Sequence, residues 1–224
     1  MFLLRKYTIK HRLVLLLVFV LAGLIILSSI SLSKAYQSLL QQKYSANKQV
    51  VETAFSVVKH YYQQQSAGNL TETQAKEQAI SVVNNLRYDN GNYFWINDFS
   101  PTIIMHPIKA SLIGKNVADL KDVDGLNIFV EMVNVVKANG QGFIPYKWPR
   151  PGVDHPVEKI SFVKGFTPWQ WVIGSGTYID DIDAVFSSQR NTLLSYALII
   201  VFIIAMLGYL IGKSIITPTH AASD

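Results

Sequence analysis

A set of cationic and hydrogen-bond-donating side chains is spread over short aromatic and β-branched runs in the middle of the sequence. Its members are Arg87, Tyr93, Trp95, His106, Tyr146, Trp148 and Lys159. Lysine and arginine are expected to be permanent cations, while tyrosine, tryptophan and histidine donate O–H or N–H hydrogen bonds. Carboxylates are scarce among their neighbours on the same strand faces. A pocket made of such groups would hold a compact anion, most simply a small carboxylate, and its aromatic walls would limit the size of that anion.

Strand periodicity places most of these side chains on one face of a sheet. Turn residues separate runs that predict strands at 92–97, 102–106, 142–148, 158–165 and 169–177, with residues 98–101 turning the first two into a hairpin. Side chains alternate along a strand, so one face receives the set Tyr93, Trp95, His106, Tyr146, Trp148 and Lys159. The opposite face receives an apolar set, Phe94, Ile96, Ile103, Met105, Ile160 and Phe162.

Each of these residues taken alone also has a purely structural interpretation. His106 precedes a proline and is typical of a strand-end histidine bonded to backbone, and Lys159 is compatible with a solvated strand position. The tryptophans are compatible with core packing, and Arg87, after a helix, with capping its last carbonyls. The shared strand face favours the ligand-binding interpretation, because independent structural roles would not require it.

Helices must position this sheet. Residues 34–68 follow a heptad spacing, residues 71–87 begin with the capping-box pair Thr71 and Gln74, and residues 124–139 form an insertion closed by Gly140. Asn47 occupies a position of the heptad seam. It would fix register if the seam faces a second chain, or reach solvent at the helix edge if the seam packs on its own sheet.

Two uncharged apolar runs, residues 13–33 and 191–212, are long enough to cross a bilayer. The first exceeds the apolar region of a signal peptide and lacks a small-residue cleavage site, which favours a retained anchor over a cleaved leader. Four lysine or arginine residues precede it, so the positive-inside rule predicts cytoplasmic segments at 1–12 and 213–224 and an external domain at 34–190. The expected location is the bacterial inner membrane, in contact with lipid, with a periplasmic domain.

Several classes of protein are disfavoured. The sequence has no cysteine, which excludes disulfides and thiolate chemistry, and it has no recognisable hydrolase, phosphate-loop or metal-binding spacing. The positive charge is concentrated before the first apolar run and gives no indication of a nucleic-acid partner. We therefore expect a non-enzymatic protein without cofactor or metal.

The motifs, in this order along the chain, resemble the single Cache domain of type 2, the external sensor of many bacterial methyl-accepting chemotaxis proteins. They are RYDNGNYFWIND, MHP, LIGKN, DGLN, GQGFIPYKWPRPG, EKISFVKGF and WQWVIGSGTYIDDID, within residues 87–183. The resemblance implies an α+β fold, a PAS-like antiparallel sheet of about five strands with a long N-terminal helix, flanked by two transmembrane helices. It also implies a homodimer through the long helices and a pocket for two- and three-carbon carboxylates such as acetate, propionate, pyruvate or lactate. The pocket residues it implies are Trp95, His106, Tyr146, Trp148 and Lys159, followed by Tyr93 and Arg87.

Chemoreceptors of this family continue beyond the second span into a HAMP linker and a signalling module. Residues 213–224 resemble the entry to such a linker, so we expect either a truncated receptor or a sensor whose cytoplasmic signalling module lies in another chain. Two other functions stay open. One is a Cache sensor of a histidine kinase or cyclic-dinucleotide enzyme, and the other is a ligand-free dimerisation module of a membrane complex.

Overall fold

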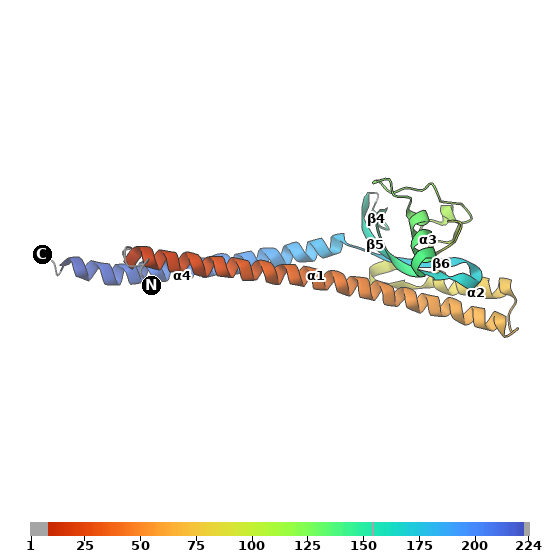
Figure 1. Ribbon diagram of the computed structural model, residues 1–224, viewed down its shortest axis with the longest axis horizontal. Helices are drawn as coiled ribbons and strands as arrows, with labels where there is room; N and C mark the ends of the chain where they lie inside the picture. The colour runs from red at the N-terminus through yellow and green to blue at the C-terminus, as the bar shows by residue number, and fades with distance from the viewer. Residues whose placement is uncertain (1–8, 154, 222–224) are drawn as a thin grey trace. The chain divides into compact units, whose positions relative to one another are not determined.

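The structure, a computed structural model, describes residues 9–153 and 155–221 (Figure 1). The outer ends of the predicted cytoplasmic segments, residues 1–8 and 222–224, therefore lie outside the described residues. The chain forms two compact units, one from Leu39–Asp181 and the other from Met1–Ser38 with Ile182–Asp224. The first unit carries the sheet, and we call it the sheet unit.

Along the described part of the chain, two helices precede three strands, a third helix separates these from three more strands, and a final helix follows (Figure 1). The helices are α1 Ile9–Ser66, α2 Glu72–Asn85, α3 Ile128–Asn139 and α4 Asp180–Ala221. The strands are β1 Arg87–Tyr88, β2 Asn92–Asp98, β3 Ile103–Met105, β4 Gln141–Pro149, β5 Pro156–Phe166 and β6 Trp171–Tyr178. Short 3₁₀ turns occupy Asp89–Gly91, Ala110–Leu112 and Thr167–Trp169.

The described strands form one antiparallel six-stranded sheet with the order β1-β2-β6-β5-β4, and β3 pairs with β2. This confirms the predicted α+β class and all five predicted strands. The sixth, β1, was not predicted because two residues are too few to show an alternating pattern. The central strand β6 pairs with both β2 and β5, and β4 is an edge strand.

The two faces of the sheet pack on different helices. One hydrophobic cluster joins apolar residues of α1 and α2, such as Val51 and Ala79, to Phe94, Ile96 and Phe162 of the sheet. The other joins the opposite face to α3 (Figure 1) and contains the predicted ligand-face residues Tyr93, Trp95, Tyr146 and Trp148. The predicted division of the faces is thus confirmed for these residues.

One residue of the predicted apolar face, Ile103, lies on the opposite face of the sheet in the structure. Ile103 belongs to the α3 cluster, whereas Met105 packs on the α1 side. The β2–β3 register shifts between Ile96 and Asn97, so Ile103 pairs with Asn97 and Met105 with Ile96. Such a bulge changes the face that a side chain occupies, and simple alternation does not anticipate it.

Local hydrogen bonds explain where the helices begin and end. Thr71 and Gln74 form the predicted reciprocal capping box of α2, and Gly140 ends α3 in the left-handed region with φ 75°. The predicted start of α3 at residue 124 is wrong. The Oδ1 atom of Asp122 accepts hydrogen bonds from the backbone N–H groups of Asp124 and Leu126, which holds this segment in a turn until Ile128.

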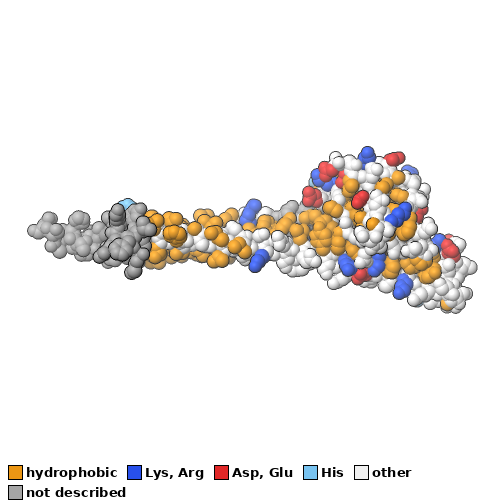
Figure 2. Space-filling model, viewed as in Figure 1, with side chains coloured by type: hydrophobic (Ala, Val, Ile, Leu, Met, Phe, Trp, Pro, Cys, Tyr) orange, Lys and Arg blue, Asp and Glu red, His pale blue; other side chains and the backbone are white. Residues whose placement is uncertain are grey.

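The second unit contains two helical segments long and apolar enough to cross a membrane, within Val14–Ser66 and Phe186–Leu210. Their apolar side chains are exposed; Phe19 is 75 % exposed and Phe202 is 70 % exposed. Figure 2 shows hydrophobic side chains along these helical segments, while the charged side chains gather on the sheet unit. This distribution agrees with the two predicted spans.

Candidate ligand-binding site

Lys159 lies inside the sheet unit, where its side chain is 1 % exposed. Its Nζ donates a hydrogen bond of 3.3 Å to the hydroxyl of Tyr93. It also lies 4.5 Å from the ring centre of Tyr93, 4.9 Å from that of Tyr178 and 5.6 Å from that of Trp95. Among the side chains that the structure describes, no carboxylate forms an ion pair with it. Burial lowers the pKa of Lys159 to about 7, so the expectation of a permanent cation is wrong.

Two tyrosine hydroxyls lie on the same face of the sheet as Lys159. Tyr146 is directly opposite Lys159 on β4, and its hydroxyl lies 2.9 Å from Oγ of the fully buried Ser161. Burial raises the pKa of Tyr93 to about 12, despite hydrogen bonds with Trp148 and Tyr178, and raises that of Tyr146 well above its usual value. Both phenols therefore stay neutral and are able to donate O–H hydrogen bonds.

His106 is held as a neutral ring with a defined tautomer. Its Nδ1 accepts hydrogen bonds from the backbone N–H groups of Ile108 at 3.3 Å and Lys109 at 3.0 Å. Burial, together with the charges of Lys159 and Lys109, lowers the pKa of His106 to about 3. The proton of the neutral ring is then on Nε2, which leaves His106 one N–H donor. The backbone-bonded interpretation of this histidine is correct, and it leaves the other nitrogen for a ligand.

Aromatic rings enclose these polar groups. The ring centres of Tyr93 and His106 are 5.1 Å apart, and those of His106 and Trp148 are 6.4 Å apart. Trp148 also contacts Tyr146 and, from α3, Phe129. The indole N–H of Trp95 donates to Oδ1 of Asn97 at 3.1 Å, so Trp95 contributes a wall and not a donor.

The glycines of β6 leave the space that the enclosed side chains occupy. A Cβ at Gly174 would collide with the indole of Trp95. A Cβ at Gly176 would collide with Oγ of Ser161 and lie 2.6 Å from Cε of Lys159. Neither position admits a larger residue without displacing a group of the cluster.

The structure brings together six of the seven predicted site residues and leaves one apart. Arg87 is exposed, and its guanidinium donates to the backbone carbonyls of Asn84 and Leu86 at the end of α2. This placement matches the capping alternative and separates Arg87 from the other six residues.

Tyr178 was missed by the sequence reasoning. It pairs directly with Lys159 across β5 and β6, and its hydroxyl donates to the backbone carbonyl of Pro149 at 3.0 Å. The alternation that assigned the other strands, continued through Gly174, Gly176 and Tyr178, would have found it. We call the group Tyr93, Trp95, His106, Tyr146, Trp148, Lys159, Ser161 and Tyr178 the lysine cluster.

A surface hollow of about 300 Å³ adjoins the lysine cluster at Trp148. Its lining includes Lys109, Lys121 and Lys147 together with Asp122. The amine of Lys109 lies 4.9 Å from the ring centre of Trp148 and therefore sits between the hollow and the cluster wall.

The sequence profile of one protein family, Single Cache domain 2, matches residues 39–191. The chain belongs to this family. Over 98 % of its length it is 38 % identical to the methyl-accepting chemotaxis protein McpP of Pseudomonas putida, and it covers 40 % of that protein. Over 66 % of its length it is 33 % identical to the sensor histidine kinase MctS of Rhizobium johnstonii, of which it covers 31 %. The chain thus spans about two fifths or less of these curated relatives.

Solved structures support the same fold for the Cache domain. One, described as the structural basis for carboxylic acid recognition by a Cache chemosensory domain, is 41 % identical with a TM-score of 0.62; the match covers 64 % of this chain and 97 % of that one. Another, a periplasmic sensor domain of a chemotaxis protein, is 38 % identical with a TM-score of 0.61, and the match covers 63 % of this chain and 97 % of that one.

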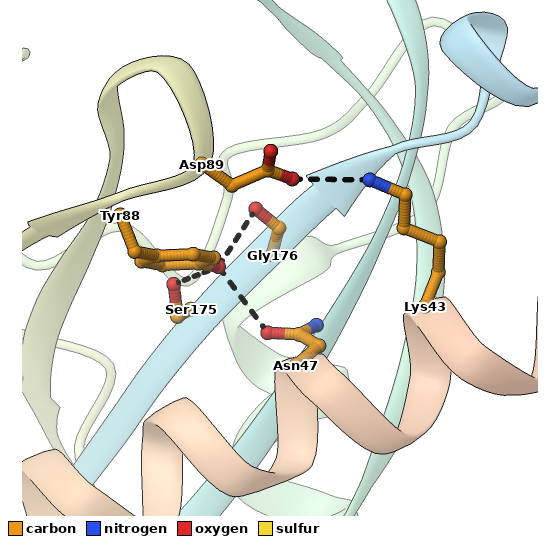
Figure 3. Close-up of polar contacts among 6 residues, drawn as sticks. All are labelled: Lys43, Asn47, Tyr88, Asp89, Ser175 and Gly176. Carbon is orange, nitrogen blue, oxygen red and sulfur yellow. Dashed lines mark hydrogen bonds and ion pairs between the residues drawn. The ribbon is translucent and has the colours of Figure 1, made fainter.

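A buried polar network connects the site of the Cache domain to α1 (Figure 3). Asn47 of α1 is 1 % exposed, and its Nδ2 donates to the backbone carbonyl of Ile160, next to Lys159. Figure 3 shows the hydroxyl of Tyr88 between Oδ1 of Asn47 and Oγ of Ser175, at 3.5 Å and 2.8 Å. Asn47 therefore faces its own sheet, as the second alternative supposed, but it is buried there and does not reach solvent at the helix edge.

The same network reaches the lysine cluster through β2. Oγ of Ser175 donates to the backbone carbonyl of Tyr93 at 2.6 Å. On the outer side, the amine of Lys43 forms an ion pair of 3.0 Å with Asp89 (Figure 3). The sheet is thus bonded to α1 directly behind the strands that carry Tyr93 and Lys159.

Proposed function

We propose that the Cache domain binds a small carboxylate in the lysine cluster and that the chain is the sensor region of a transmembrane chemoreceptor. The observation that carries this proposal is the buried amine of Lys159, which has no carboxylate partner among the described side chains. A buried cation is stable only when it is paired and hydrogen-bonded. A ligand carboxylate supplies the missing partner.

The surrounding donors complete the recognition of a carboxylate. Lys159 forms a charge-assisted hydrogen bond with one oxygen, and Nε2–H of His106 and the hydroxyls of Tyr93 and Tyr146 supply further donors. Trp95, Trp148 and Tyr178 limit the carbon skeleton to a few atoms. The proposed ligand class is therefore the two- and three-carbon acids, such as acetate, propionate, pyruvate or lactate. The similar structure described for carboxylic acid recognition supports this class.

The ligand-free dimerisation module is less compatible with this site. Such a module has no need for a buried lysine whose charge is destabilising, and an apolar residue there would make it more stable. The buried Lys159 lowers the stability of the fold, and such a destabilising residue is typical of a functional site.

We further propose an inner-membrane receptor with the Cache domain in the periplasm, both termini in the cytoplasm and a homodimer formed through α1. The two apolar helical segments and the similarity to McpP and to a periplasmic sensor domain support the membrane location. In this proposal the ligand enters through the lysine-lined hollow beside Trp148 and favours one arrangement of the helices. A downstream signalling module then responds to that arrangement. Because MctS is 33 % identical, a histidine kinase is the second candidate for this module, with the same ligand site.

The test is calorimetric titration of the full chain, in phospholipid nanodiscs, with acetate, propionate, pyruvate and lactate. Lys159→Met removes the amine and keeps an unbranched side chain that is one atom shorter. Lys164→Met is the matched control, because Lys164 lies on the same strand but contacts Glu52 and Phe55 of α1. A charge-assisted hydrogen bond contributes about 1.5–3 kcal/mol, so Lys159→Met is expected to weaken binding about 10- to 150-fold.

The control variant is expected to bind the same acids with unchanged affinity. If a folded wild-type chain binds none of the four acids, the proposed ligand class is wrong. If Lys159→Met binds them as tightly as the wild type, the lysine cluster is not the site.

A further inference from the structure

Among the side chains that the structure describes, those in contact with Lys159 or on the same sheet face beside it are aromatic or hydroxyl-bearing and include no acid. Tyr93 and Trp95 belong to β2, His106 follows β3, Tyr146 and Trp148 belong to β4, and Tyr178 belongs to β6. Because burial raises the pKa of Tyr93 and Tyr146 and lowers that of His106, these three groups are uncharged at neutral pH. Two described cations lie against the rings of the cluster. Lys109 lies over Trp148, and the Arg150 guanidinium is 4.8 Å from the ring centre of Tyr178.

This environment opposes the charge on Lys159 as long as the site holds no anion. Burial removes the water that would stabilise an ammonium group, and among the described side chains no acid compensates for that loss. The pKa of Lys159 falls to about 7, so near neutral pH a large part of the population carries the free amine. A carboxylate in contact with Nζ reverses this, because an opposite charge within about 4–6 Å favours the protonated form.

We infer that the carboxylate binds together with one proton, which the amine of Lys159 takes up from solvent. The amine and the proton give an ammonium group, which then pairs with the ligand carboxylate, and no covalent bond is made or broken. The site thereby receives one negative and one positive charge and stays neutral overall. The inference rests on the proposed function, since it needs a carboxylate in the lysine cluster.

A consequence is that the affinity depends on pH within the physiological range. With a pKa of about 7 in the free site, roughly a tenth of the amines are protonated at pH 8 and roughly nine tenths at pH 6. Binding then takes up about 0.9 proton at pH 8 and about 0.1 proton at pH 6. The apparent dissociation constant rises about tenfold from pH 6 to pH 8 and about tenfold more from pH 8 to pH 9. The occupancy of the site would thus depend on both the carboxylate concentration and the pH.

The other titrating groups of the cluster do not produce this pattern. The pKa of His106 is about 3, so uptake by the imidazole would be small at both pH values. The pKa of Tyr93 is about 12, so this phenol keeps its proton throughout the range. A proton uptake that is larger at pH 8 than at pH 6 therefore identifies the amine.

The test uses the full wild-type chain in phospholipid nanodiscs, titrated with acetate and with propionate at pH 6 and pH 8. At pH 8 each titration is done in phosphate and in Tris, and at pH 6 in phosphate and in Mes, because both buffers of each pair titrate near that pH and differ in ionisation enthalpy. The difference in observed binding enthalpy between the two buffers, divided by the difference in ionisation enthalpy, gives the number of protons taken up. We expect about 0.9 at pH 8 and about 0.1 at pH 6, with a dissociation constant about tenfold higher at pH 8.

Lys164→Met serves as the control and should give the same proton numbers. Binding with the same enthalpy in both buffers at pH 8 would overturn the proton uptake and leave the proposed carboxylate function standing. If neither acid binds at pH 6, where the amine is already charged, the proposed function fails for these two ligands, and the inference fails with it.

Discussion

Replacing Lys159 by methionine is expected to make the ligand-free Cache domain more stable. The amine has a pKa of about 7 in the folded chain and 10.5 as its ordinary value. The unfolded chain therefore binds more protons between these values, and at pH 6 the difference costs the native state about 5 kcal/mol. The cost is fully present below pH 7 and is lost as pH rises towards 10.5, with about 1 kcal/mol left at pH 10. Because the side chain is fully buried, solvent does not screen this cost.

Part of this gain is lost with the contacts of the ammonium group. The hydrogen bond to Tyr93 and the contacts with the rings of Tyr93, Trp95 and Tyr178 together contribute about 1–2 kcal/mol. The net stabilisation of Lys159→Met at pH 6 is then about 3 kcal/mol. For a domain of this size that raises the thermal midpoint by about 10 °C.

Tryptophan fluorescence during heating measures this midpoint for the sheet unit alone. All four tryptophans of the chain, Trp95, Trp148, Trp169 and Trp171, lie within residues 39–181. The wild type and Lys159→Met are compared without ligand at pH 6 and pH 10, with Lys164→Met as the control. We expect Lys159→Met to have a higher thermal midpoint than the wild type at pH 6 and nearly the same midpoint at pH 10. A lower midpoint at pH 6 would refute this expectation, because the lysine would then stabilise the fold.

Three further substitutions test individual contacts by the same fluorescence assay and by titration with propionate. Asn47→Ala should lower the free energy of unfolding by about 1–3 kcal/mol, because it leaves a buried strand carbonyl without its donor. The control Gln49→Ala, on the exposed side of α1, should change it by less than about 0.5 kcal/mol. Equal effects of the two substitutions would contradict the role of Asn47. Gly176→Ala should lower the free energy of unfolding by about 1–3 kcal/mol and weaken propionate binding, because the added Cβ would lie 2.6 Å from Cε of Lys159. Unchanged binding would place the ligand elsewhere. His106→Asn should keep an acceptor for the backbone N–H groups of Ile108 and Lys109 and remain about 1–3 kcal/mol more stable than His106→Leu. Both variants lose the Nε2 donor and should bind propionate more weakly. Equal stability of the two variants would argue against the Nδ1 contacts.

The sequence was sufficient for the fold class, the five longer strands and most of the cluster. The alternation of side chains predicted the correct sheet face where a strand is regular, as for Tyr93 with Trp95 and for Tyr146 with Trp148. In a regular strand, side-chain direction follows from residue parity alone. The alternation failed at Ile103, because an extra residue in β3 opposite Ile96 and Asn97 of β2 shifts the register.

The chemistry of the cluster depends on three-dimensional contacts that no local pattern encodes. The low pKa of Lys159 follows from rings supplied by two other strands. The tautomer of His106 follows from the path of the backbone after Pro107. Asn47 has its partner 113 residues further along the chain, so its position in a heptad pattern did not reveal its role.

The position of each strand in the sheet suggests where this pocket is able to evolve. All eight residues of β6 are buried, with Gly174 and Gly176 against the lysine cluster and Ser175 bonded towards α1, so changes there disturb two packed layers at once. The edge strand β4 has only one neighbour and alternates buried with more exposed positions. Substitutions at Tyr146 and Trp148 would therefore reshape the proposed ligand site while disturbing only one neighbouring strand. Divergence in acid preference among related receptors is expected to concentrate on β4 and to spare the glycines of β6.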